Sequence, residues 1–101
     1  MEIRVDDCVE KFIKELEENA VAKVLRSIDL LEKFGYELKL PHTKKIKRDL
    51  FELRIRGQQE VRIFYTFHKK GIVLLHGYIK KSQKIPNHEL KVAVKRICLL
   101  T

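Results

Sequence analysis

Cysteine is scarce in this chain, because only two of its 101 residues, Cys8 and Cys98, are cysteines. They lie far apart in the sequence, and each falls within an apolar helical stripe. No histidine lies near either residue at the spacing of zinc ligands. We therefore expect two reduced, buried thiols, no metal site and no cofactor, in a chain long enough to form a modest core without them.

Long hydrophobic runs are also missing, since no apolar stretch approaches the ~20 residues that cross a bilayer. The first residues, Met1 to Asp7, lack the basic-then-apolar pattern of a signal peptide. The chain has no internal repeat, linker or low-complexity tract. These absences predict one domain over residues 1–101 that has no contact with a membrane and stays in the cytoplasm.

Acidic residues are nearly absent from residues 41–101, which contain only Asp49, Glu52, Glu60 and Glu89. A two-metal nuclease needs several convergent carboxylates, so that mechanism is not expected here. A glycine-rich phosphate loop, a His-Glu-x-x-His motif, a Cys-x-x-Cys motif and a nucleophile elbow are absent too. What remains is metal-free chemistry with arginine, lysine, histidine and tyrosine.

Positive charge is concentrated in this same part of the chain. Residues 1–40 contain seven lysines and arginines against ten acids, whereas residues 41–101 contain fifteen against four. A strongly basic half raises the local concentration of phosphate polymers and speeds encounter with them. Solvated surface lysines are the simpler explanation, but the excess is confined to the half that contains the predicted sheet.

Three short strands are predicted at hairpin spacing, at about residues 51–56, 61–68 and 72–81. The turns between them, Gly57–Gln59 and Lys69–Gly71, each contain a glycine that can take a positive φ. Strict alternation places aliphatic side chains, among them Val73, Leu75, Gly77 and Ile79 of the third strand, on one face. It places Arg54, Arg56, Arg62, Phe64, His68, Leu74, His76, Tyr78 and Lys80 on the other. This second face suits RNA, which offers phosphates, stackable bases and a 2′-hydroxyl that can attack the adjacent phosphate.

Apolar residues at three- and four-residue steps predict two helices before these strands. The first has Asp6 or Asp7 as its N-cap, and the second ends at Gly35 as its C′ residue. A polar stretch from Pro41 to Asp49 leads into the strands, and a last helix follows with Asn87 as its N-cap. The predicted fold class is α+β: an N-terminal helical hairpin packed on a small antiparallel three- to four-stranded sheet, with a C-terminal helix.

Three segments of the strands resemble the RelE superfamily of type II toxin–antitoxin toxins, most of all its phage-derived, HigB-like branch. They are Leu53-Arg54, Arg62-Ile63-Phe64-Tyr65 and the run His76-Gly77-Tyr78-Ile79-Lys80-Lys81-Ser82-Gln83-Lys84-Ile85-Pro86. The resemblance covers about residues 8–99 and implies a RelE-like microbial RNase fold. It also implies a toxin that cuts mRNA in the ribosomal A site and is silenced by a cognate antitoxin. Members usually open with a full β-strand, for which only Glu2 to Val5 is available here.

The resemblance and the polar face together assign catalytic roles to two arginines. Arg62 matches the family's phosphate-stabilising arginine. A guanidinium suits this role because it offers several fixed donors to a pentacovalent phosphate. The competing interpretation of Arg62 is a surface pair with Glu52 or Glu60 across the strands. Arg54 lies on the same face, where it can grip the same phosphate or a neighbouring one.

Three further candidates are proton carriers or cations. His76 has a side chain whose ordinary pKa of ~6.5 suits a general acid or base, although it is equally well a hydrogen-bonded wall residue. Lys80 and Lys81 end the third strand and match a basic cluster that, in the family, contributes to catalysis or grips RNA. Aromatic residues of the polar face are expected to stack on bases, and exposed lysines to extend the positive surface. The predicted RNA-binding residues are Lys44, Lys45, Lys47, Phe64, Tyr78 and Lys84.

The sequence therefore predicts a metal-independent, ribosome-dependent mRNA endonuclease with an antitoxin, the ribosome and mRNA as its partners. Two alternatives stay open. The domain binds RNA or the ribosome and blocks translation without cutting, or it is a decayed toxin that serves as an antitoxin-binding module. The same cations serve binding and catalysis, so the residues alone do not separate these readings.

Overall fold

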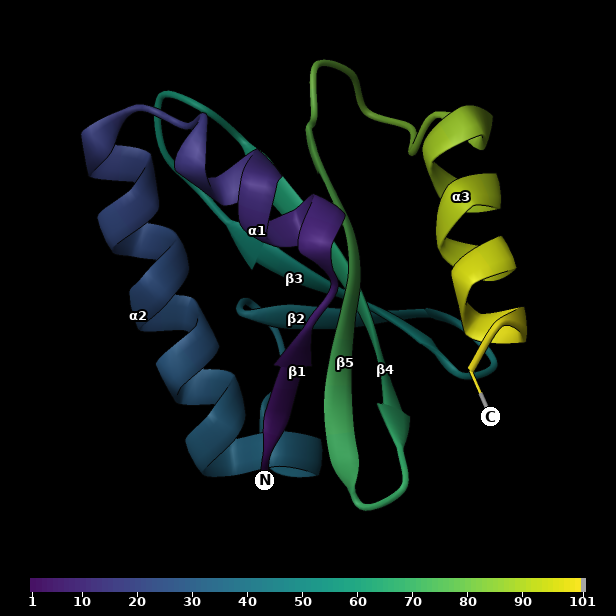
Figure 1. The fold of residues 1–101 in the computed structure, drawn as a ribbon. Helices are drawn as coiled ribbons and strands as arrows, with labels where there is room; N and C mark the ends of the chain where they lie inside the picture. The colour runs from purple at the N-terminus through teal and green to yellow at the C-terminus, as the bar shows by residue number, and fades with distance from the viewer. Residues whose placement is uncertain (101) are drawn as a thin grey trace.

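The computed structural model describes residues 1–100, which form one five-stranded sheet flanked by helices (Figure 1). In chain order the elements are β1 (Ile3–Val5), α1 (Asp7–Lys14), α2 (Glu18–Phe34), a 3-10 turn η1 (Gly35–Glu37), β2 (Thr43–Lys47), β3 (Leu50–Ile55), β4 (Val61–His68), β5 (Gly71–Ile79) and α3 (Asn87–Cys98). The strand order is β1-β5-β4-β3-β2, in which β1 runs parallel to β5 and all other pairs are antiparallel. Across residues 1–100, no helix has the length and apolar character needed to cross a bilayer.

The sheet is larger than predicted and is mixed rather than antiparallel. The additional strand β2 lies in the stretch from Pro41 to Asp49 that the sequence predicts to be a polar lead-in. β2 is an edge strand in which only Thr43 is buried. Its exposed lysines therefore leave no alternation of apolar and polar residues to be read in the sequence. The short β1 does form, and main-chain bonds from Ile72 to Glu2 and from Asp6 to Leu74 extend its pairing. β1 has only three residues, too few to show a period of two in the sequence, so only its pairing with the distant strand β5 identifies it.

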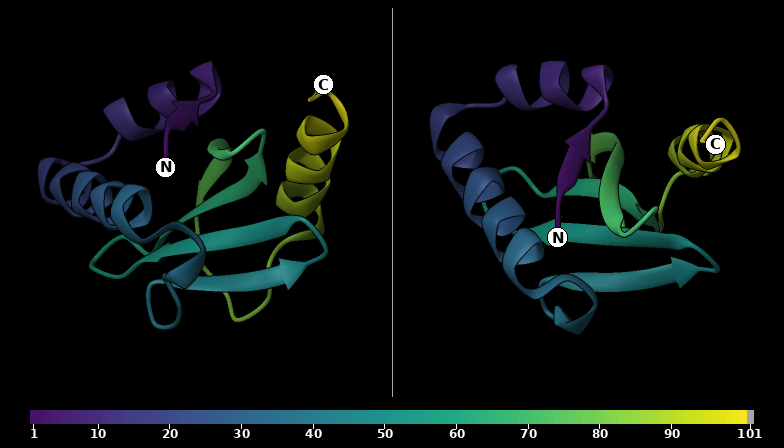
Figure 2. Two further views of the ribbon diagram at one scale, coloured as in Figure 1. Left: turned by 90° about the horizontal axis from the view of Figure 1, so that it is seen from below. Right: turned by 60° about the horizontal axis from the view of Figure 1, so that its bottom comes forward.

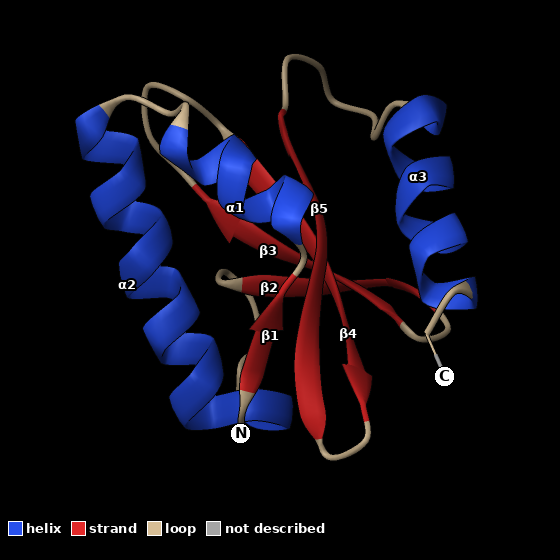
Figure 3. Ribbon diagram, viewed as in Figure 1, coloured by secondary structure: helices blue, strands red, loops and turns tan. Residues whose placement is uncertain are grey.

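Helices pack on both faces of the sheet (Figures 2 and 3). Residues of α1 and α2 such as Val9, Val24 and Leu31 join the aliphatic face of β3, β4 and β5 in one core, as the sequence predicts. The opposite face is not open, because α3 packs on it through the fully buried Ala93. The domain therefore has three layers, with α1 and α2 on one side of β5 and α3 on the other.

A β-bulge in β5 changes which side chains reach each core. Phe64 of β4 pairs with His76, but the next residue, Tyr65, pairs with Leu74, so Leu75 is an extra residue in β5. Leu74 consequently packs in the core beneath α1 and α2, whereas Leu75 joins the core beneath α3. The strict alternation predicted for this strand is wrong because a bulge breaks the period of two.

Caps and turns agree with the sequence in part. The side chain of Asp6 accepts a hydrogen bond from the Cys8 amide at 3.0 Å and caps α1, and Gly35 ends α2 with a φ of 51°. The β4–β5 turn uses Lys69 and Lys70 at φ 48° and 64°, rather than the predicted glycine. The N-cap position of the last helix is Pro86 and the helix begins at Asn87, one residue earlier than expected with Asn87 as its N-cap.

Gly77 allows α1 to pack closely on β5. A Cβ atom at this position would overlap the ring of Phe12, a residue of α1 that packs against the strand. We expect Gly77→Ala to lower the free energy of unfolding by about 1–3 kcal/mol, measured by urea denaturation, because a packed ring has little room to move. Gly57→Ala is the matched control, since its Cβ would meet chiefly the end of the flexible Lys23 side chain. Equal losses from both substitutions would contradict this account of the packing.

Candidate functional site

A hollow of about 630 Å³ opens where β3 ends, β4 begins and the chain leaves β5. Its lining, which we call the cationic hollow, consists of Arg54, Arg56, Glu60, Arg62, Lys80, Lys81, Ser82 and Gln83. Strand register explains the grouping, because Arg54 pairs with Arg62 and Arg62 pairs with Tyr78 on adjacent strands. Side chains directly opposite one another share a face. Five cations and one carboxylate in the lining favour an anion.

Two of the three arginines of the hollow, Arg54 and Arg62, flank a buried carboxylate. One carboxylate oxygen of Glu52, Oε1, lies 3.9 Å from Nε of Arg62 and 3.8 Å from Nε of Arg54. The side chains of Glu52 and Arg62 are only 2% and 3% exposed, and that of Arg54 is 19% exposed. Charges this deeply buried are retained only when they are paired. Glu52 therefore fixes both guanidinium groups.

Two further acceptors hold Arg62 in place. Its Nη1 donates to the Val61 carbonyl at 3.0 Å, and its Nη2 donates to Glu60 Oε1 at 3.3 Å. The Nε atoms of Arg62 and Arg54 are buried and have no hydrogen-bond partner within residues 1–100. The predicted pairing of Arg62 with Glu52 or Glu60 thus occurs with both, inside the protein rather than at its surface.

The positive excess of the hollow comes from its outer residues. Arg54 and Arg62 are balanced by the two carboxylates Glu52 and Glu60. Arg56, Lys80 and Lys81 also line the hollow, and no salt bridge to them occurs among residues 1–100. These three cations meet an incoming anion first, above the buried arginines.

Protonation states in the hollow follow from its hydrogen bonds. The Gly57 amide, 3.1 Å from Glu60 Oε2, lowers the pKa of Glu60, and the bond from Arg62 lowers that pKa further. Burial, followed by the nearby charge of Glu52, raises the pKa of Tyr78. The tyrosine hydroxyl therefore stays protonated and donates to Glu52 Oε2 at 3.5 Å. At neutral pH Glu60 in the lining is therefore ionised, and the phenol of Tyr78 is neutral.

His76 lies outside the cationic hollow. Its Nε2 is 2.7 Å from Oε1 of Glu89 in α3, and its Nδ1 is 3.4 Å from Nη1 of Arg96. His76 pairs with Phe64 on the face that α3 covers, so this geometry matches the alternative of a hydrogen-bonded wall residue. The catalytic role of His76 remains a prediction that its position does not support.

Arg96 links this cluster to Cys8 at the start of α1. Its Nη1 donates to the thiol sulfur of Cys8 and, at 2.6 Å, to the carbonyl of Leu75. Burial, above all other effects, raises the pKa of Cys8 to about 11, so this thiol stays protonated. Cys98 is exposed, because it lies one helical step off the stripe of α3 that faces the sheet. The prediction of two buried thiols is therefore wrong for Cys98, and Cys8 is only partly buried.

The aromatic residues predicted to bind bases are buried. Phe64 is 0% and Tyr78 is 4% exposed, and their rings stack on each other with centroids 5.6 Å apart beneath α3. The expected open face does not exist here, because α3 covers it. Neither ring has a free surface for a base in this arrangement.

The predicted basic residues separate into two groups. Lys80 and Lys81 line the hollow, and Lys84 is exposed in the loop beyond, where the Ser82 hydroxyl donates to its carbonyl at 3.1 Å. The exposed lysines of β2 are separated from β5 by the two strands β4 and β3 and lie outside the hollow. They are Lys44, Lys45 and Lys47.

Sequence reasoning missed Arg56 and Glu60 as members of the site. Alternation places Arg56 on the same face as Arg54, and Glu60 stands two residues before Arg62. Both residues follow or precede a strand, where alternation is a weak guide. The turn brings them to the hollow, and the Gly57 amide holds the Glu60 carboxylate there.

Comparisons with known proteins agree on a family and a fold. The sequence profile of the family described as phage derived protein Gp49-like matches residues 11–97. Among solved structures, the fold is similar to a chain in the heterotetrameric complex of YoeB-YefM toxin-antitoxin from Staphylococcus aureus. The sequence identity is 18% and the TM-score is 0.54, over 73% of this chain and 90% of that chain. No curated protein matches the sequence significantly.

The role of Glu52 can be tested by removing its charge alone. Glu52→Gln leaves two buried guanidinium groups without their shared counter-ion, so we expect a loss of about 3–5 kcal/mol in the free energy of unfolding. The control is Glu10→Gln, which removes an exposed pair with Lys14 and should cost less than about 1 kcal/mol. Urea denaturation measures both. A loss for Glu52→Gln no larger than the control would show that the pair stabilises nothing.

The lowered pKa of Glu60 predicts a pH dependence. A carboxylate whose pKa is lower in the folded protein stabilises the fold above its unfolded pKa, and this contribution disappears as pH falls through the folded pKa. Wild type should therefore be more stable than Glu60→Gln at neutral pH, and the difference should close in acid. Urea denaturation across this pH range measures the gap. A gap that widened as pH fell would contradict the assignment.

Proposed function

This chain belongs to the phage-derived Gp49-like family, and we propose that it is the toxin of a type II toxin–antitoxin system. The similar fold of a chain from a toxin–antitoxin complex supports this proposal. Within the RelE superfamily we assign it to the HigB-like branch, on the strand motifs that contain Arg62 and the run His76 to Pro86. Its partners in this proposal are a cognate antitoxin, the ribosome and mRNA in the cytoplasm.

We propose further that the toxin is a metal-independent, ribosome-dependent mRNA endonuclease. The observation that carries this proposal is the cationic hollow, in which outer cations stand above two arginines that share the buried carboxylate of Glu52. Such a site suits a phosphate, and guanidinium groups held in advance stabilise the charge of a phosphorane without reorganising. Its lining contains one carboxylate, Glu60, and five cations.

The proposed reaction uses the RNA's own nucleophile. The 2′-oxygen attacks the adjacent phosphorus, the bond to the 5′-oxygen breaks, and the products are a 2′,3′-cyclic phosphate and a 5′-hydroxyl. Glu60 is the ionised carboxylate of the lining and accepts the 2′-hydroxyl proton, although its lowered pKa makes it a weak base. The ammonium group of Lys80 or Lys81 donates a proton to the leaving 5′-oxygen. Arg62 and Arg54 stabilise the negative charge between these two events.

The burial of Arg62 favours a second candidate function. Its guanidinium is paired with two carboxylates and a carbonyl, as a purely structural arginine would be. In that case the outer cations bind RNA or the ribosome and block translation without cutting. The two candidates differ in their product, since only the nuclease creates new RNA ends.

Induced expression in a bacterial host, followed by primer extension on a translated transcript, separates these functions. We expect wild type to arrest growth and to create new 5′ ends, and Arg62→Ala to lose both, with cleavage reduced at least ~100-fold. Lys80→Ala/Lys81→Ala should also lose cleavage while remaining folded, because both side chains reach solvent. This double variant guards against loss of the fold in Arg62→Ala. The control is Lys91→Ala on the exposed side of α3, which should act like wild type.

Each outcome of this experiment decides between the candidates. New ends that disappear in both site variants support the nuclease. Growth arrest without new ends supports the translation blocker. Folded wild-type protein that neither arrests growth nor cuts RNA would contradict both.

A further inference from the structure

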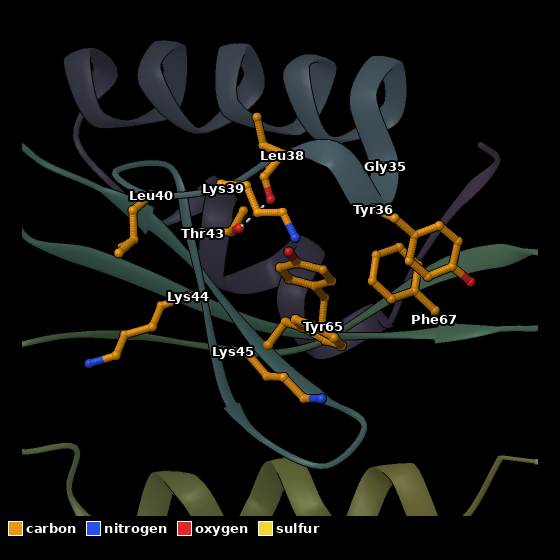
Figure 4. A pocket seen from close by; sticks show the side chains of 11 residues that line it. Gly35, Tyr36, Leu38, Lys39, Leu40, Thr43, Lys44, Lys45, Tyr65 and Phe67 are labelled. Carbon is orange, nitrogen blue, oxygen red and sulfur yellow. Dashed lines mark hydrogen bonds between the residues drawn. The ribbon is translucent and has the colours of Figure 1, made fainter.

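A second surface, whose lining Figure 4 shows, lies on the opposite face of the sheet from the cationic hollow. It is a groove of about 520 Å³, whose floor is formed by the rings of Phe51, Tyr65 and Phe67 on β3 and β4. These residues pack with the core of α1 and α2, whereas Arg54 and Arg62 alternate with that core and face away from it. We call this surface the aromatic groove. No step of the proposed RNA chemistry uses it.

Large apolar side chains are exposed along one wall of the groove. Tyr36 and Leu40 line it and are each 62% exposed, and the neighbouring Phe34 is 44% exposed. Within residues 1–100, these are three of the six large hydrophobic residues that are exposed. Figure 4 shows the ring of Tyr36 lying against that of Phe67, with centroids 3.9 Å apart. Large apolar side chains exposed around a groove are typical of an interaction site.

Lysines, and no acidic residue, accompany these apolar side chains. Lys39, Lys44 and Lys45 line the groove, and the Lys45 ammonium lies 5.9 Å from the centre of the Phe51 ring. A second copy of this chain is a poor occupant, because each copy carries a net charge of +8 and the two would repel each other. The exposed lysines of the edge strand β2 also disfavour pairing of that edge with another strand. The charge complement of the groove is an acidic segment.

Nucleic acid fits the groove less well than a peptide does. Its aromatic rings are already stacked in pairs, Tyr36 on Phe67 and Phe51 on Tyr65. The floor of the groove therefore offers apolar edges to aliphatic side chains more than free ring faces to bases. Its wall includes Leu38 and Leu40, which contribute nothing to phosphate binding.

We propose that the aromatic groove docks an acidic, amphipathic segment of a partner protein. Its apolar side chains cover Tyr36 and Leu40, and its carboxylates meet Lys39 and Lys45. The identification of that partner as the antitoxin rests on the proposed function. Because the groove and the hollow lie on opposite faces, the segment anchors the partner without filling the hollow.

Fluorescence anisotropy tests this docking with a short fluorescein-labelled peptide of alternating glutamate and leucine. We expect Tyr36→Ala and Lys45→Glu each to weaken its binding about tenfold or more, as loss of an interface anchor does. Lys91→Glu, on α3, makes the same charge change away from the groove and should stay within about twofold of wild type. Hydrogen exchange should slow at residues 34–45 when the peptide binds.

Three results would overturn the proposal. They are no binding of the peptide to the folded wild type, equal losses from Lys45→Glu and Lys91→Glu, and a Tyr36→Ala effect that is larger on a single-stranded oligoribonucleotide than on the peptide. The last result would make the groove a nucleic-acid surface. Binding is read without growth arrest or RNA cleavage, so a failure here leaves the nuclease proposal standing. A failure of the nuclease proposal likewise leaves the peptide result unchanged.

Discussion

The buried carboxylate of Glu52 is the interaction on which the site depends. Placing a guanidinium inside a small domain is costly unless a counter-charge lies beside it, and Glu52 serves Arg54 and Arg62 at once. The strands that bear these residues also bear the core residues Leu53 and Ile63 on their other face. The stability of the core and the geometry of the cationic hollow are therefore properties of the same two strands.

Helix α3 divides one face of the sheet into a core and a site. Where the helix lies on β4 and β5, Phe64 and Tyr78 are buried as ordinary core residues. Beyond the area that α3 covers, the same strands expose the hollow that contains Arg62. Tyr78 stands at the boundary, with its ring in the core and its hydroxyl on Glu52. This contact couples the packing of α3 to the position of the buried charges.

Periodicity predicted the helical hairpin, three of the strands and the common face of Arg54 and Arg62, because local spacing determines each of these. It did not predict β1 or β2, since one is too short and the other too rich in lysine to show a period. The burial of Phe64 and the faces of Leu74 and Leu75 were mispredicted for a tertiary reason, because no local pattern shows that α3 covers this face or that a bulge interrupts β5. The family resemblance gave Arg62 a catalytic role, which stays a prediction, and it carried no information about the burial of this side chain.

The cationic hollow and the aromatic groove are both lined by cations and attract anions, but the residues beneath those cations favour different ligands. Beneath the outer cations of the hollow lie the guanidinium groups of Arg54 and Arg62, which suit a ligand able to accept hydrogen bonds from several directions, as a phosphate does. Beneath the lysines of the aromatic groove lie Phe51, Tyr65 and Phe67, which reward apolar side chains and offer few donors. Long-range charge brings RNA and acidic protein to the same molecule, so net charge cannot sort them. Short-range desolvation distinguishes the two ligands instead. It disfavours a phosphate placed over aromatic rings and an aliphatic side chain placed over buried arginines.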